Sequence, residues 1–346
     1  MKNFSQMISM HFHTISLLLL SILLLSKSHP LSELILRPEQ SKIESRDYIN
    51  LILNRTTYIE TFTAFGHCYP KDIEAGKCCP NLLPNEKFVP NEEGWELIDY
   101  GISTASEEER EGVFINERNH YAIFRNDLIK KIIITFPGTK REASQGIREA
   151  VFGYLVNFKL NKYKGDIKLT KYFGLRSYLT IRDLFKESNL KNMRLDQNYQ
   201  IIFTGHSLGG AMAVGTMFFA LDQGIITREG NHPVAITFGQ PRTGNEEFAL
   251  TVQREAEVIY RHTNYQDPVH QIPFYSWGGR QTQGRIFITG DDKEYFVESD
   301  IFEYDVDKIE DSQEYNVFDI VKYLIFGMHR HVYYYGIKLD GLCEKH

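Results

Sequence analysis

The segment between residues 199 and 215 constrains the fold more than any other part of the chain. It begins with an apolar run at 199–204, continues through Gly205-His-Ser-Leu-Gly209, and ends in small residues up to 215. The apolar run predicts a buried strand, and the small residues predict the start of a helix. Joining the two through one serine requires a sharp turn with strained backbone angles, which leaves no room for side chains at Gly205 and Gly209. We therefore predict that Ser207 lies at the tip of a tight strand–turn–helix unit.

The rest of the chain alternates between strand-like and helix-like patterns. Apolar runs predict strands at 121–125, 129–136, 200–204, 234–238 and 258–261, and Asn126-Asp127 joins the first two as a hairpin. Apolar residues at helical spacing predict helices at 44–65, 147–158, 175–189 and 208–223. This alternation predicts an α/β fold with a mostly parallel central sheet and helices on both faces. Sites in such sheets lie at the carboxyl ends of the strands.

The first 28 residues have the pattern of a secretory signal peptide. Lys2 precedes an almost purely apolar run at 12–25, and Ser26 and Ser28 fit a small-x-small cleavage site. The alternative is an uncleaved anchor, which the length disfavours because a spanning helix needs roughly 20 apolar residues. Removal of residues 1–28 leaves 29–346, which we expect to form one domain without a transmembrane segment. We expect this domain to be secreted or delivered to a lysosome or vacuole.

The cysteines and the charge agree with this route. An even set of cysteines in an oxidising compartment predicts two disulfides, and four residues allow three connectivities. The set consists of Cys68, Cys78, Cys79 and Cys343. A glycosylation sequon stands at Asn54-Arg-Thr. With 39 Lys and Arg against 45 Asp and Glu, the chain carries a net charge of −6 and lacks the cationic balance of a nucleic-acid-binding protein.

Four further segments accompany the Gly205–Gly209 motif. They are ITFPGT at 134–139, TFGQPRTGN at 237–245, the segment from YRHTN to DPVHQIP at 260–273, and HVYYYG at 331–336. Together with the Gly205–Gly209 motif, and in their order along the chain, these segments resemble the five motifs of the fungal-type, or class 3, triacylglycerol lipases. The resemblance runs from about residue 58 to residue 343. It implies the α/β-hydrolase fold and the activity of a carboxylic ester hydrolase.

The resemblance, together with chain order, assigns catalytic roles to three side chains. A serine hydroxyl needs a base to become a nucleophile, and the base needs an acid to orient it. In α/β-hydrolases the order along the chain is serine, acid, histidine. The expected nucleophile is Ser207, the expected acid is Asp267 at the end of a strand, and the expected base is His331. Asp222 is the alternative acid, and the alternative bases are His262, His270, His329 and His346.

Two backbone N–H groups are expected to bind the oxyanion of the reaction. One belongs to Leu208, the residue after the nucleophile. The other belongs, by resemblance, to Thr139, whose hydroxyl could add a third donor. The alternative for Thr139 is an ordinary turn residue after Pro137-Gly138.

Three segments leave the shape of the site open. Residues 140–158 lie where the family carries its lid, and their apolar spacing predicts either an amphipathic lid or an ordinary core helix. Residues 171–178 depart from the family pattern, which leaves the acyl pocket undefined. Residues 291–314 contain eleven acids and two lysines, and predict a solvated insertion loop. A calcium site there is the alternative, although EF-hand spacing is absent from the segment.

These expectations describe a monomeric enzyme that needs no metal or organic cofactor. It acts on lipid esters at an oil–water or membrane surface, and cleaves fatty-acyl esters of glycerolipids through an acyl-enzyme. A phospholipase, a galactolipase or a cinnamoyl-type esterase is the alternative on the same fold. From another class, the alternative is an inactive hydrolase-fold protein that binds lipid or glycan. Ester panels separate the enzymes, and fluorophosphonate labelling separates an enzyme from a binding protein.

Overall fold

The computed structural model describes a central α/β unit. The described residues are 63, 94–103, 119–138, 154–186, 199–264, 267, 269–273, 277–288, 295–297, 331–334 and 337–339. The predicted signal peptide, the sequon, the four cysteines, Thr139 and most of the lid segment lie outside these residues. Within them, no helix is long and apolar enough to cross a membrane.

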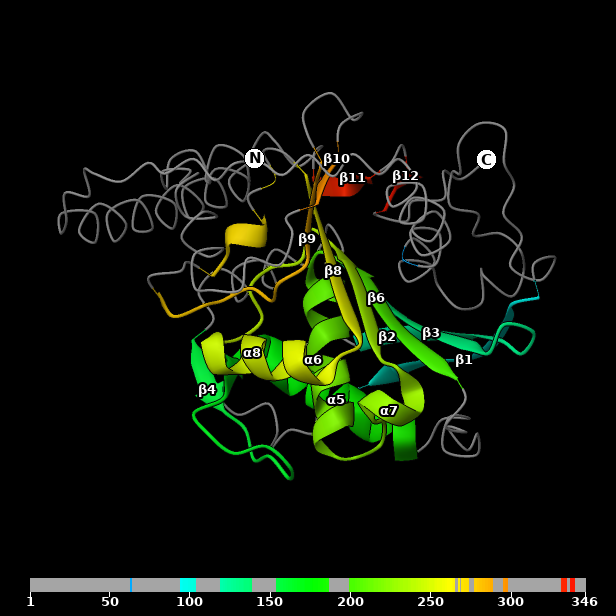
Figure 1. The fold of residues 1–346 in the computed structure, drawn as a ribbon, viewed down its shortest axis with the longest axis horizontal. Coiled ribbons are helices and arrows are strands. Elements are labelled where there is room, and N and C mark those ends of the chain that lie inside the picture. Colours follow the sequence, from blue (N-terminus) through cyan, green and yellow to red (C-terminus); the bar gives the residue numbers. More distant parts are fainter. Residues whose placement is uncertain are drawn as a thin grey trace, which may run out of the picture.

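An eight-stranded sheet runs through the described part of the chain (Figure 1). Its strands, in spatial order, are β1 (Glu96–Ser103), β2 (Asn119–Asn126), β3 (Lys131–Phe136), β6 (Gln200–His206), β7 (Val234–Phe238), β8 (Val258–Asn264), β9 (Arg285–Ile288) and β10 (Tyr295–Val297). The five strands from β3 to β9 are parallel, whereas β1–β2, β2–β3 and β9–β10 pair antiparallel. The sheet is therefore mostly parallel, as the alternation of patterns predicts.

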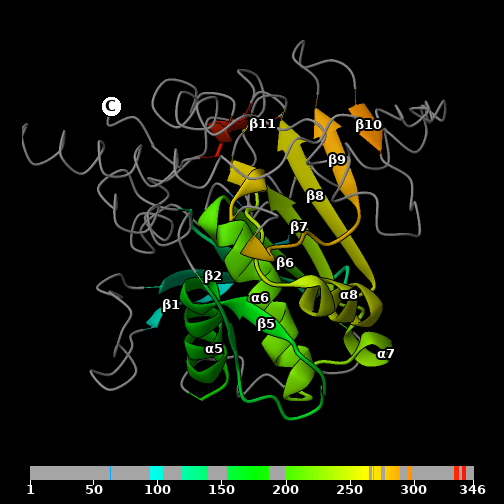
Figure 2. The same ribbon diagram turned by 90° about the vertical axis from the view of Figure 1, so that its left-hand side faces the viewer.

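Three helices pack against one face of this sheet (Figure 2). They are α5 (Lys171–Lys186), α6 (Leu208–Asp222) and α8 (Glu246–Glu255). Every residue of α6 is buried, because it lies between the sheet and its neighbouring helices. A helix that is apolar on all sides suits such a central position. The single-turn helix α7 (Arg228–Asn231) precedes β7, and the 3-10 helix η3 (Val269–Gln271) follows β8.

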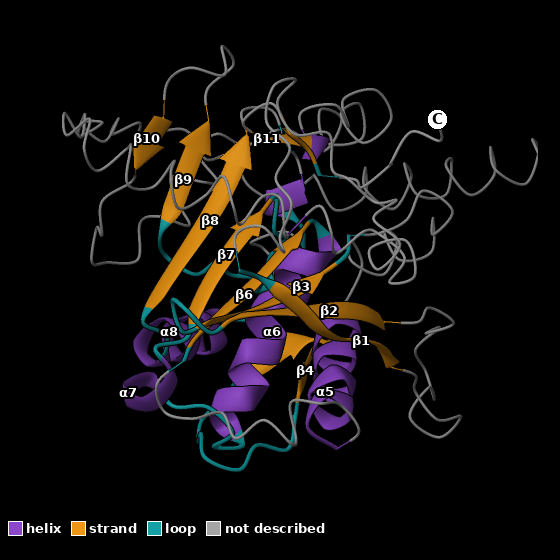
Figure 3. Cartoon of the chain, turned by 90° about the vertical axis from the view of Figure 1, so that its right-hand side faces the viewer, coloured by secondary structure: helices purple, strands orange, loops and turns teal. Residues whose placement is uncertain are grey.

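The alternation of side chains along each strand supplies a second core on the opposite face. Ile132 and Ile134 of β3 face the helices, whereas Ile133 faces the other way and packs with Ile202 and Phe238. Among the described residues, this second core also receives Tyr334 of β11 (Tyr333–Tyr334) and Leu339, which follows β12 (Ile337–Lys338). Figure 3 shows β11 beyond the carboxyl ends of the parallel strands. The carboxyl-terminal segment therefore returns to the edge where the site is predicted.

The hairpin between β2 and β3 differs slightly from the prediction. Its turn covers residues 127–130, so Ile129 lies in the turn and is exposed rather than part of the strand. The side-chain oxygen of Asn126 accepts hydrogen bonds from the backbone N–H groups of Leu128 and Ile129. These hydrogen bonds form the turn directly after Asn126, so β2 ends at residue 126, one residue later than the predicted end at 125.

Two further predictions need correction. The helix expected at 147–158 does not reach its predicted end, because Leu155–Asn157 form strand β4, which pairs antiparallel with β5 (Lys168–Thr170). The acidic segment 291–314 is not wholly a loop, because Tyr295–Val297 form β10 at the edge of the sheet. In both cases a strand partner from elsewhere in the chain overrides the local pattern. Of the helix predicted at 44–65, the described residue Thr63 is helical and buried, and its Oγ1 lies 2.6 Å from Oγ1 of Thr204.

Candidate active site

Ser207 occupies the sharp turn between β6 and α6. Its backbone angles, φ 56° and ψ −125°, fall in a region that residues with a side chain rarely adopt. Its backbone N–H donates to the carbonyl of Phe238 at 2.8 Å, which ties the turn to the end of β7. The surrounding structure therefore holds the serine at the carboxyl edge of the sheet, in the strained geometry that the sequence predicts.

The two glycines of the motif are required by close backbone contacts. A Cβ atom on Gly205 would stand 2.2 Å from the carbonyl oxygen of Gly209, and one on Gly209 would stand 2.2 Å from that of Phe136. Both distances are far below any allowed contact, and both partners are backbone atoms that have little freedom to move. The close passage of Phe136 past Gly209 also brings the end of β3 beside the start of α6. The loop after β3, where Thr139 is expected, begins at this point.

Asp267 and His331 form a buried pair. Nδ1 of His331 lies 2.9 Å from Oδ2 of Asp267, and both side chains are almost wholly removed from solvent. The hydroxyl of Tyr334 donates to the same carboxylate oxygen at 3.1 Å, and the backbone N–H of Val269 donates to the other oxygen at 2.9 Å. The carboxylate is therefore oriented by three donors from two distant parts of the chain.

The surroundings keep the carboxyl of Asp267 ionised. Burial acts to raise its pKa, but the charge of His331, the hydrogen bond from His331, the charge of His270 and the backbone N–H of Val269 outweigh this effect. Together they lower the pKa of Asp267 from 3.8 to about 2. An ionised carboxylate is the state that orients an imidazole and stabilises its protonated form.

The pairing also defines the tautomer of His331. Because a carboxylate only accepts hydrogen bonds, Nδ1 of His331 carries a hydrogen, and in the neutral ring Nε2 then keeps its lone pair. Nε2 is buried and has no hydrogen-bond partner among the residues that the structure describes. A nitrogen in this state is equipped to accept a proton from a hydroxyl.

One dipeptide connects the serine to this pair. Phe238 accepts the hydrogen bond from the backbone of Ser207, and the next residue, Gly239, lies against both His331 and Asp267. The structure thus brings all three predicted residues to the same end of β7. Leu208, the predicted oxyanion donor, is buried as the first residue of α6.

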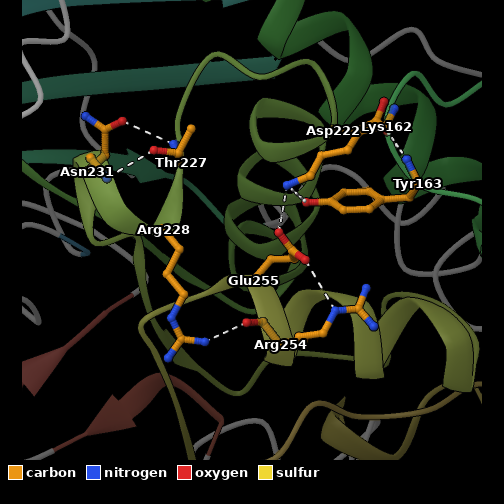
Figure 4. A network of polar contacts seen from close by, with 9 residues as sticks. Lys162, Tyr163, Asp222, Thr227, Arg228, Asn231, Arg254 and Glu255 are labelled. Atoms are coloured by element: carbon orange, nitrogen blue, oxygen red, sulfur yellow. Dashed lines mark hydrogen bonds and ion pairs between the residues drawn. The ribbon is translucent and has the colours of Figure 1, made fainter.

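The alternative residues have other positions. Asp222 lies at the far end of α6, where its carboxylate accepts backbone N–H bonds from Asn161, Lys162 and Tyr163. Figure 4 shows it beside the Lys162–Glu255 ion pair. His262 lies within β8 and stacks on Phe238, and burial lowers its pKa from 6.5 to about 3.

Of the remaining alternative bases, His270 lies in η3 directly after Val269 and is buried. His329 and His346 lie outside the described residues.

Sequence reasoning missed three residues of this site. Tyr334 and Gly239 stand within motifs that the sequence displays, but their contacts with Asp267 and His331 appear only after folding. His206 stands directly before the serine, and its ring lies against that of His331. No group of three or more metal-binding side chains occurs among the residues that the structure describes.

One protein family matches the central part of the chain. The family Lipase (class 3) matches residues 133–277, a stretch that includes Ser207 and Asp267. This part of the chain is therefore similar to the class 3 lipases. Its fold is that of the α/β-hydrolases.

Two relatives and one solved structure are also similar to this chain. The secreted mono- and diacylglycerol lipase 1 of Fusarium solani is 34% identical over 101 residues, which cover 29% of this chain and 28% of that protein. A lipase of Rhizopus niveus is 28% identical over 226 residues, covering 64% of this chain and 52% of the relative. The chain thus spans about half or less of the length of these relatives. The solved structure of lipase II from Rhizopus niveus aligns with a TM-score of 0.61 at 20% identity, and covers 84% of this chain and 96% of the other.

Proposed function

We propose that this protein is a class 3 lipase, a secreted carboxylic ester hydrolase that cleaves fatty-acyl esters of glycerolipids. The observation that carries the proposal is the arrangement at the end of β7. A strained serine and a histidine meet at one dipeptide. Nδ1 of this histidine is hydrogen-bonded to a buried carboxylate, and its Nε2 has no hydrogen-bond partner among the described residues. Nucleophilic acyl transfer requires a serine, a histidine that can accept its proton and a carboxylate that orients the histidine.

In the proposed reaction, Ser207 attacks the ester carbonyl while Nε2 of His331 takes the hydroxyl proton. Asp267, ionised at neutral pH, stabilises the imidazolium that forms. The proton then passes to the leaving alcohol, and an acyl-enzyme remains. Water, deprotonated by His331, attacks the acyl-enzyme and releases the fatty acid. The N–H groups of Leu208 and Thr139 are the proposed donors to the oxyanion in both steps.

The substrate class and the location of the protein rest on its relatives. Several relatives are named lipases, and the Fusarium solani protein is named a secreted mono- and diacylglycerol lipase. We infer lipid esters as substrates and the secretory route as the pathway, in agreement with the predicted signal peptide.

Hydrolysis of tributyrin tests the proposal. Purified wild type and Ser207→Ala are compared on dissolved tributyrin and on its emulsion. Because triad residues act as a unit, Ser207→Ala is expected to lower turnover by about 10⁶ while the protein stays folded. Near-full activity in this variant would rule out Ser207 as the nucleophile. A rate increase at the onset of emulsion formation would support a lidded lipase, whereas activity on dissolved ester alone would indicate an esterase with an open pocket.

A further inference from the structure

His206 connects the nucleophile turn to the proposed base. It is the last residue of β6 and directly precedes Ser207, and its side chain is buried against His331. We propose that His206 is a positioning residue, which holds the main chain of His331 so that Nε2 points at the serine. This inference rests on the proposed function, because it assigns His206 a role only if His331 is the base.

The first contact is a hydrogen bond between side chain and main chain. Nε2 of His206 lies 2.6 Å from the carbonyl oxygen of His331. A carbonyl oxygen only accepts, so Nε2 of His206 carries the hydrogen and donates it. The two residues are 125 positions apart in the chain, and both are buried. This bond therefore fixes the backbone of His331 relative to the strand that ends in Ser207.

The second contact is between the rings. The ring centroids of His206 and His331 are 4.5 Å apart with an interplanar angle of 41°. His206 also lies 6.2 Å from the ring of Tyr334, which itself donates to Asp267. The histidine before the serine thus packs on the base and on the tyrosine that orients the acid. Displacement of His331 would have to disturb all of these contacts together.

The chemistry of the reaction explains why an imidazole suits this position. His331 becomes positively charged during proton transfer, and a lysine or arginine in place of His206 would oppose that charge at close range. A neutral imidazole donates to the carbonyl without adding charge. Proton transfer also depends steeply on the placement of the base, so that a shift of about 1 Å in His331 costs roughly 100-fold in rate.

Three variants test the role of His206. His206→Phe keeps a ring and removes the donor, whereas His206→Gln keeps an amide N–H that can reach the carbonyl. The matched control is His262→Phe, since His262 is an equally buried histidine with Nδ1 3.2 Å from the carbonyl of Thr237. Hydrolysis of the soluble ester p-nitrophenyl butyrate is measured between pH 5 and 9. Fluorophosphonate labelling of the serine and the melting temperature are measured on the same samples.

We expect His206→Phe to lower kcat by about 10- to 100-fold with KM within about twofold, because positioning acts on the transition state. We also expect the acidic limb of the pH profile to move to lower pH, because a displaced His331 loses stabilisation from Asp267. His206→Gln should recover most of kcat. His262→Phe should change the melting temperature without moving the limb.

Some results would contradict the role of His206, and others would contradict the proposed function. The inference is wrong if His206→Phe keeps the wild-type kcat and pH profile, if its effect equals that of His262→Phe, or if His206→Gln recovers nothing. If His206→Phe does not fold, His206→Asn, whose amide is one bond too short for the carbonyl, is judged by the same criteria. If the wild type neither hydrolyses esters nor reacts with the fluorophosphonate, the proposed function itself fails.

Discussion

The backbone of Gly239 lies directly against the ring of His331. A Cβ atom built on this glycine would stand 2.7 Å from Cε1 of His331 and 2.9 Å from Oδ2 of Asp267. Gly239 also has φ +57°, a conformation that favours glycine. The end of β7 therefore has no space for a side chain at the point where the acid and the base meet.

We predict that Gly239→Ala separates or tilts the Asp267–His331 pair and lowers kcat by about 100-fold. Both partners are buried, so neither can move aside without losing packing. The matched control is Gly224→Ala, because Gly224 has a similar φ of +68° with open space around its Cβ position. Both variants should lose about 1 kcal/mol of stability from the backbone conformation, but only Gly239→Ala should lose activity. Ester hydrolysis and urea unfolding of the two variants measure this difference.

Asp267 should contribute to stability in a defined pH range. Its pKa is lowered to about 2 in the folded state, so its contribution is complete above pH 4 and is lost as the pH falls toward 2. We predict that Asp267→Asn is less stable than wild type at pH 5 and that the difference narrows by pH 3. Urea unfolding at the two pH values measures it. An unchanged difference would mean that the carboxylate is not stabilised by its partners. The variant should also lose about 10⁴ in kcat, since the histidine is no longer held in the required tautomer.

His262 should make stability depend on pH over a higher pH range than Asp267 does. Burial lowers its pKa to about 3, so the folded state excludes a proton that the unfolded state binds below about pH 6.5. Stability from the neutral side chain is therefore complete above pH 6.5 and declines as the pH falls toward 3, by at most about 1.4 kcal/mol per pH unit. We predict that His262→Phe has a flatter profile than wild type between pH 6.5 and 4. Thermal unfolding across this range is the measurement, and parallel profiles would contradict the prediction.

Asp222 should stabilise the protein without taking part in the reaction. Its carboxylate accepts N–H bonds from Asn161, Lys162 and Tyr163, and it lies about 20 Å along α6 from Ser207. Asp222→Ala leaves these donors without their acceptor, which should cost about 2–4 kcal/mol.

Activity per folded molecule should stay at the wild-type value in Asp222→Ala, measured at a temperature where the variant is folded. The control is Asp166→Ala. Asp166 lies in the same loop as Asn161, Lys162 and Tyr163, and its exposed carboxylate pairs with Lys168. Solvent screening makes that pair weak, so the control should unfold close to wild type. A loss of kcat in folded Asp222→Ala would show that the far end of α6 affects the site.

Long local patterns were sufficient to predict much of the fold. The unit from β6 to α6 agrees with its prediction because the strand, the turn and the helix are specified by adjacent residues. Short strands were not predictable in the same way. Residues 155–157 have apolar spacing that fits a helix, but pairing with 168–170 makes them a strand. Likewise β10 lies in an acidic stretch and is a strand because β9 offers it an edge.

The sequence by itself determined the strand–turn–helix around Ser207, the alternation that makes a mostly parallel sheet, and the candidate acid and base. The first two depend on residue types at fixed spacing along the chain, whereas the acid and the base rest on the resemblance of their motifs to those of the class 3 lipases and on chain order. Tertiary structure alone decided which side chains meet. Asp267 and His331 are 64 residues apart, and His206 and His331 are 125 apart. Their contacts exist because the sheet brings the ends of β6, β7 and β8 to one edge and the carboxyl-terminal segment returns to it, and no local pattern specifies that approach.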